Sequence, residues 1–208
     1  MRGSRTLRFV AAALWAFFAL TAPRGALACA CCTNPGQRYV EVEALDSGRL
    51  EQIESVRFGK AAMLFVGEAD PQSIAGIATP VERYDLTVAW DKSRPGTTRA
   101  VFALGNQEGR SGTLSLELPK KISIFEVDPR DSADEGTGPT LYKEWKLTGE
   151  VTGCDAFASS NGPRQRLTLI LQGRGNACTS GGDFTAWTLV MQGPRANYAL
   201  FGDLVPSE

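Results

Sequence analysis

The sequence predicts an all-β protein, either a single antiparallel β-barrel with meander-like connections or a two-sheet β-sandwich. Apolar and polar residues alternate along most of the chain from Tyr84 to Phe201, which is typical of half-buried strands. Clusters of Gly, Pro, Asn and Ser divide this pattern into short runs, as turns divide hairpin strands. Roughly eight or nine such strands must close or pack in two sheets, because one open sheet would leave its apolar face in water.

The first 28 residues are typical of a secretory signal peptide. Arg2, Arg5 and Arg8 precede an apolar run at 9–20, and Ala26 and Ala28 supply the small residues that a signal peptidase recognises. As a helix, this run covers about 18 Å, whereas the hydrocarbon core of a bilayer is about 30 Å thick. We therefore expect cleavage after residue 28 and export to the periplasm or the medium, with no transmembrane segment in the mature chain.

The first part of the mature chain predicts two strands and at most one short helix. Residues 39–43 alternate and form a first strand, and the compact apolar run at 61–66 has the length of a second. Leu50, Ile53 and Val56 recur at three-residue spacing, which indicates the short helix near residues 49–58.

Further strands are expected wherever the period-2 pattern continues. These lie at 84–90, 97–104, 114–118, 122–124, 141–151, 167–171, 187–191 and 198–201. Turn-forming residues separate them at 93–96, 105–109, 159–163, 180–182 and 193–194. No internal repeat or long linker divides the chain, so we predict one domain over residues 29–208.

Three of the five cysteines lie together at the start of the mature chain, as Cys29-Ala30-Cys31-Cys32. A disulfide between adjacent or nearly adjacent cysteines has strained geometry. Three thiolates in four residues are suited to Cu(I), which prefers soft sulfur ligands. Cys29 is alternatively the acylated residue of a lipoprotein, although Ala26 stands where a lipobox has a large aliphatic residue. Bridges from Cys31 or Cys32 to later cysteines are a third reading.

Cys154 and Cys178 are expected in loops that follow two strands, where an oxidising compartment favours a disulfide between them. Closing a loop of about 25 residues would stabilise the fold by about 3–4 kcal/mol. In the competing arrangement, one or both pair with Cys31 or Cys32 and fix the N-terminus to the sheet. An odd number of cysteines leaves at least one thiol free, lipidated or shared with another chain.

Two further groups of residues need an interpretation. Aromatic residues on the predicted strands are expected to be core, with a barrel lumen for an apolar ligand as the alternative. This set is Tyr84, Trp90, Phe125, Trp145, Phe184, Trp187, Tyr198 and Phe201. Four acids lie in one glycine-containing loop, where their spacing differs from an EF-hand and favours a solvated loop over a calcium site. These are Asp128, Asp131, Asp134 and Glu135.

The composition excludes several classes of function. The chain has no histidine, which rules out Ser-His-Asp and Cys-His hydrolases and zinc sites built on histidine. The leader holds four of the 22 basic residues and none of the 23 acidic ones, so the mature chain is negatively charged and offers no nucleic-acid footprint. We predict a non-catalytic binding or interaction domain without a cofactor, whose partner is a protein or a small apolar ligand. The alternative is a thiol-redox or Cu(I)-handling envelope protein that acts through Cys29, Cys31 and Cys32.

Overall fold

The computed structural model describes residues 35–66, 81–130, 141–175 and 181–205, and it confirms the all-β class. Within these ranges, twelve strands form one antiparallel sheet that is not closed into a barrel. The strands are β1 (Arg38–Ala44), β2 (Arg57–Phe58), β3 (Ala61–Phe65), β4 (Val81–Asp91), β5 (Arg99–Gly105), β6 (Ser111–Glu117), β7 (Lys121–Val127), β8 (Tyr142–Gly149), β9 (Val151–Asp155), β10 (Arg166–Arg174), β11 (Phe184–Gln192) and β12 (Tyr198–Val205). The described helices are α2 (Ser47–Ser55) and two 3₁₀ turns, η3 (Ala158–Ser160) and η4 (Gly181–Asp183).

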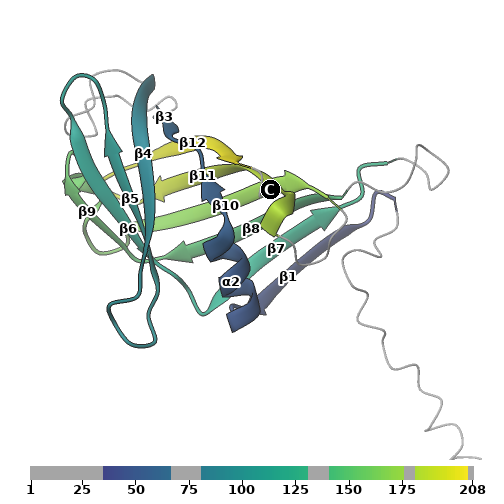
Figure 1. Cartoon of the computed structure of the whole chain (residues 1–208). Helices are drawn as coiled ribbons and strands as arrows, with labels where there is room; N and C mark the ends of the chain where they lie inside the picture. The colour runs from purple at the N-terminus through teal and green to yellow at the C-terminus, as the bar shows by residue number, and fades with distance from the viewer. Residues whose placement is uncertain (1–34, 67–80, 131–140, 176–180, 206–208) are drawn as a thin grey trace, which may run out of the picture.

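The strand order combines hairpin meanders with long-range pairings. It runs β1-β7-β8-β10-β11-β12-β3-β4-β5-β6-β9, with β2 paired to β12. Strands β3 to β6 and β10 to β12 follow one another as the predicted meander, whereas β1–β7, β12–β3 and β6–β9 join segments far apart in sequence. Figure 1 shows β4, β5 and β6 at a steep angle to β8, β10 and β11, so that the sheet folds over its own apolar face.

A long two-stranded ribbon, formed by β6 and β7 on one side and β9 and β8 on the other, bends in its middle and connects distant parts of the sheet. Strand β6 continues into β7 through Leu118-Pro119-Lys120, and β8 continues into β9 through Glu150. At the bend, the Glu117 N–H donates to the Glu150 carbonyl oxygen at 3.2 Å. Proline has no N–H for a ladder and suits such a break. A Cβ on Gly149 would lie 2.1 Å from the Glu117 carbonyl oxygen, so the close approach of the two backbones requires glycine there.

The apolar face of the folded sheet is filled by large side chains. Trp145, Trp187, Tyr84 and Phe102 are among the largest fully buried residues. Phe184 packs edge-on against Trp145 with ring centroids 5.0 Å apart. The predicted aromatic core is confirmed for Tyr84, Trp145, Phe184, Trp187 and Tyr198, and Phe102 also belongs to it.

Three aromatic residues of the predicted set differ from the rest. Trp90 is partly buried against the core, and Phe125 is half-buried. Phe201 is 44% exposed, so its assignment to the core was wrong. The reason is the alternation of β12, in which Leu200 and Leu204 take the inward positions.

The predicted helix near 49–58 is α2, which ends earlier than expected. Asp46 caps it by accepting a hydrogen bond from the Arg49 N–H at 2.8 Å. Ile53 is its buried residue, while Arg57 and Phe58 belong to β2 and pair with the end of β12. Similarly, the run at 141–151 is not one strand, because the bend at Glu150 divides it between β8 and β9.

Candidate functional site

A cluster of charged side chains lies on the inward face of the folded sheet, on β7, β8 and η4. Glu126 and Lys143 are cross-strand partners, and both are buried. The Lys143 Nζ lies 2.7 Å from an Asp183 carboxylate oxygen, and the two side chains are 2% and 18% exposed. The Oε2 atom of Glu126 is buried without a hydrogen-bond partner in the described part of the chain. Burial raises the pKa of Glu126, and Asp183 adds to this, whereas Lys143 acts in the opposite direction.

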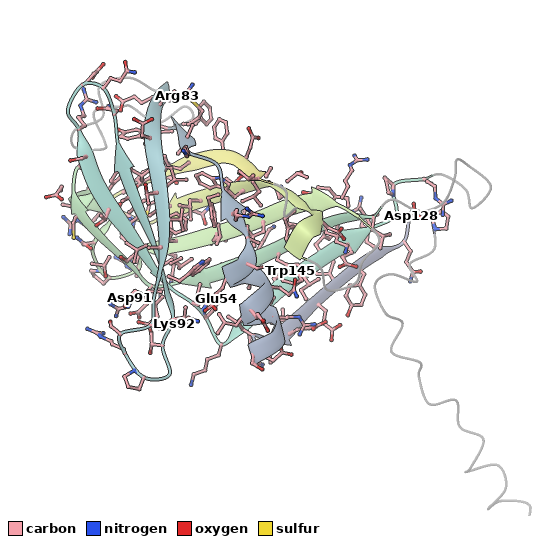
Figure 2. All side chains as sticks on the ribbon, viewed as in Figure 1. Glu54, Arg83, Asp91, Lys92, Asp128 and Trp145 are labelled. Atoms are coloured by element: carbon pink, nitrogen blue, oxygen red, sulfur yellow. The ribbon has the colours of Figure 1, made fainter. Side chains whose placement is uncertain are left out.

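Asp128, directly after β7, forms a second ion pair with Arg130 at the end of this inward face. Its side chain is fully buried, and its carboxylate accepts hydrogen bonds from Arg130 Nη2 at 2.9 Å and Nε at 3.2 Å. These bonds lower the pKa of Asp128. Its backbone carbonyl accepts from the Gly36 N–H at 2.8 Å, which ties the end of β7 to the start of β1. Figure 2 shows Asp128 at this end of the sheet. The expected solvated loop is therefore wrong for Asp128, while Asp131, Asp134 and Glu135 lie outside the described residues.

A separate polar cluster lies on β4, at the other half of the molecule. The Tyr84 hydroxyl donates to Glu82 Oε2 at 2.6 Å, and Arg110 Nη1 lies 2.6 Å from Glu82 Oε1. Nearby, the hydroxyls of Ser160 and Tyr198 are 2.7 Å apart. Burial raises the pKa of both tyrosines, so the phenols stay protonated near neutral pH. These contacts hold elements together and leave no phenolate for acid–base chemistry.

The outer face of the sheet carries a pocket of about 270 Å³ over β1, β7 and β8. Its lining residues are Val40, Ser123, Phe125, Glu144 and Lys146. They meet because the ladder places Val40 opposite Phe125, Phe125 opposite Glu144, and Ser123 opposite Lys146. Consecutive outward positions on three neighbouring strands therefore build the pocket.

Hydrogen bonds hold the polar wall of this pocket in place. Glu144 Oε1 lies 2.6 Å from the Lys146 Nζ, and Glu144 Oε2 accepts from the Tyr142 hydroxyl at 3.1 Å. Gln172 on β10 donates to the Tyr142 oxygen at 2.8 Å. The Tyr142 ring packs edge-on against Phe125 with centroids 6.1 Å apart. The pocket therefore has an apolar surface beside a carboxylate and an ammonium group that are held in place. These groups can contact a ligand that has both apolar and charged parts.

The apolar side of the pocket continues onto the edge of the sheet. Val40 and Val42 are 66% and 63% exposed, more than the other large apolar residues of the described chain. Alternation by itself would bury these valines, yet in β1 the half-buried positions belong to Tyr39 and Glu43. The strand is predicted by its sequence, whereas its exposed apolar face is not.

The predicted cysteine sites remain predictions. Cys29, Cys31, Cys32 and Cys178 lie outside the described residues. Cys154, which was expected in a loop, lies in edge strand β9 opposite Thr113, where its thiol is exposed and has no disulfide partner among the described residues. In the part of the chain that the structure describes, no three or more Cys, Asp or Glu residues are grouped to hold a metal ion.

None of the helices in the described ranges is long and apolar enough to cross a membrane. Comparison of the chain with protein-family models, with curated proteins and with solved structures found no match.

Proposed function

We propose that this protein is an exported, non-catalytic binding domain that recognises its partner on the outer face of β1, β7 and β8. The pocket beside Val40 and Phe125 carries the proposal, because it joins exposed apolar surface to an ordered pair of charges. Large apolar patches on soluble proteins mark interaction sites more often than accidents of composition. The inward face is filled by the aromatic core, so the outer face is the better candidate than a lumen.

The non-catalytic part of the proposal rests on the inventory of reactive groups. Without histidine, acid–base catalysis near neutral pH would need a carboxyl, amine or phenol with a shifted pKa. Lys143 is held by Asp183 inside the fold, and burial keeps Tyr84 and Tyr198 protonated. Export is inferred from residues 1–28, and a mass spectrum of the secreted chain tests for a start at Cys29 and for acylation there.

A screen by nuclear magnetic resonance tests the binding face. The exported, isotope-labelled protein is titrated with small amphiphilic fragments, and shifted amides are mapped onto the sheet. We expect the shifts to cluster around Val40, Ser123 and Phe125, and Phe125→Ala to abolish them. Phe201→Ala is the matched control, because it removes an exposed ring from the same face of a distant strand, β12. Fragments that bind equally well to the Phe125→Ala protein would contradict the proposal.

A second function is proposed for the N-terminal cysteines. Cys29, Cys31 and Cys32 place three soft ligands within four residues, which supports Cu(I) binding or thiol exchange. A count of free thiols on the exported protein, before and after addition of Cu(I), tests it. Protection of all three thiols by one Cu(I) supports the site, whereas thiols that stay fully reactive contradict it.

A further inference from the structure

The free backbone groups of edge strand β1 can be assigned from one hydrogen bond. Among the described strands, β1 pairs with β7 alone and ends the sheet, as Figure 1 shows. The Leu45 N–H donates to the Lys120 carbonyl at 2.9 Å, in line with the β1–β7 register. Hydrogen-bonded pairs alternate along an antiparallel ladder. Glu43, Glu41 and Tyr39 therefore bond to β7, while the N–H and C=O groups of Val42 and Val40 point away from it.

The same two residues expose their side chains beside the pocket. Val40 is 66% exposed and lines the pocket, and Val42 is 63% exposed in the next outward position. A chain that paired with the free backbone groups would also cover both valines with its own outward side chains. Backbone hydrogen bonding and apolar burial thus coincide at one place on the surface.

The opposite face of β1 carries a negative charge, which determines the kind of strand that can pair with this edge. Glu41 is exposed, and its described polar contact is the hydroxyl of Tyr39. Glu43 is instead paired with Arg49 of α2. Glu41 thus has no cation among the described residues, so a strand that pairs with β1 gains from a basic residue opposite Glu41.

A second copy of the chain fits this edge poorly. An antiparallel pairing of two β1 strands that places Val40 against Val42 also places Glu41 directly against the other Glu41. Like charges in opposed positions destabilise a ladder, and edge strands commonly use such charges to prevent self-association. The charge on this edge opposes a copy paired in that register and favours a different, basic strand.

From these contacts we propose that β1 accepts an extended segment of another protein as an additional strand, in which β-branched residues alternate with lysine or arginine. The β-branched side chains would cover Val40 and Val42 toward the pocket, and a basic side chain would meet Glu41. The inference rests on the proposed binding function of this face and adds the class of partner.

Amide hydrogen exchange on the exported protein tests whether the edge is free. Without peptide, the N–H groups of Val40 and Val42 should exchange rapidly, while those of Glu41 and Glu43 are protected by β7. The probe is the peptide acetyl-Thr-Val-Lys-Val-Lys-Val-Thr-amide, which should slow exchange at Val40 and Val42. Protection of these two amides in the free protein would show that the chain or a second copy already occupies the edge, and would overturn the proposal.

Reversing the charges on the peptide and on Glu41 tests the specificity of the pairing. A peptide with glutamate in place of both lysines should bind about fivefold to tenfold more weakly, and Glu41→Lys should reverse that preference. Asp85→Lys is the control, since it makes the same change of charge at an exposed position of β4. A lysine peptide N-methylated at alternate backbone nitrogens should not bind. Equal binding of both peptides, or an equal effect of Asp85→Lys, would refute the inference. If fragments still bind at Phe125 while the lysine peptide fails, only this inference falls, and the proposed function stands.

Discussion

The internal ion cluster allows one prediction that compares a buried lysine with an exposed one. Lys143 and Lys92 each lie 2.7 Å from a carboxylate oxygen, of Asp183 and Glu54 respectively. The Lys143 side chain is 2% exposed, whereas the Lys92 side chain is 60% exposed. Figure 2 shows the labels of Lys92 and Glu54 near each other, beside α2. Replacing each lysine by methionine keeps the length of the side chain and removes its charge.

The two substitutions should differ by a factor of several in free energy of unfolding. Removing one partner of a buried pair costs about 3–5 kcal/mol, because the other charge is left without compensation. In Lys143→Met, Asp183 keeps some contact with water, so we expect the lower end, about 3 kcal/mol. For Lys92→Met the expected loss is about 0–1 kcal/mol, because exposed pairs are screened by water.

Urea unfolding followed by tryptophan fluorescence measures both losses. With a slope of about 2 kcal/mol per molar urea, Lys143→Met should lower the midpoint by about 1.5 M and Lys92→Met by at most about 0.5 M. The loss in Lys143→Met should shrink at acid pH, where Glu126 takes up a proton and no longer repels Asp183. If the two variants unfold at the same urea concentration, the reasoning about the buried cluster is refuted.

Three more predictions follow from other parts of the fold. Gly149→Ala places a methyl group against a backbone carbonyl at the ribbon bend and should cost about 1–3 kcal/mol in a thermal or urea melt, whereas Gly105→Ala has room and should change little. Because burial raises the pKa of Glu126, the folded state holds its proton to higher pH than the unfolded state does, and stability falls as pH rises through that interval. Glu126→Gln should flatten this dependence in urea melts at a series of pH values. If Cys154 and Cys178 form the predicted disulfide, Cys154→Ser should cost about 3–4 kcal/mol, and thiol labelling of the parent protein should find neither residue reactive.

The strands could be predicted from the sequence because alternation is a local property. Each inward row is set by neighbours two residues apart, such as Leu167, Leu169 and Leu171 of β10. The order of the strands is not local. The bend at Pro119 and Glu150 divides one long hairpin into the β7–β8 and β6–β9 pairs, which lie at distant positions of the sheet. No local pattern in these strands indicates which strand pairs with which. Because the strand order cannot be predicted from local patterns, the sequence could not decide between a barrel and a sandwich.

The internal ion cluster has a signal in the sequence. Glu126 continues the inward row of Ile122 and Ile124, and Lys143 continues that of Trp145. A charged residue in an inward position must be paired or neutralised, so opposite charges on two successive strands indicate a buried pair. The position of Asp183 could not be read in this way, because it lies on a short turn that reaches Lys143 only through the fold.

The binding face depends even more strongly on tertiary pairing. By its own pattern, β1 would turn its valines inward, and its partner β7 lies about 80 residues later in the chain. In β7 the inward row is fixed by Ile122 and Ile124, so Ser123 and Phe125 face outward. The register then forces Val42 and Val40, which lie opposite these residues, onto the outer face as well. The exposure of the valines is therefore imposed by the apolar row of another strand. That is why the edge could be assigned a binding role only after the β1–β7 ladder was known.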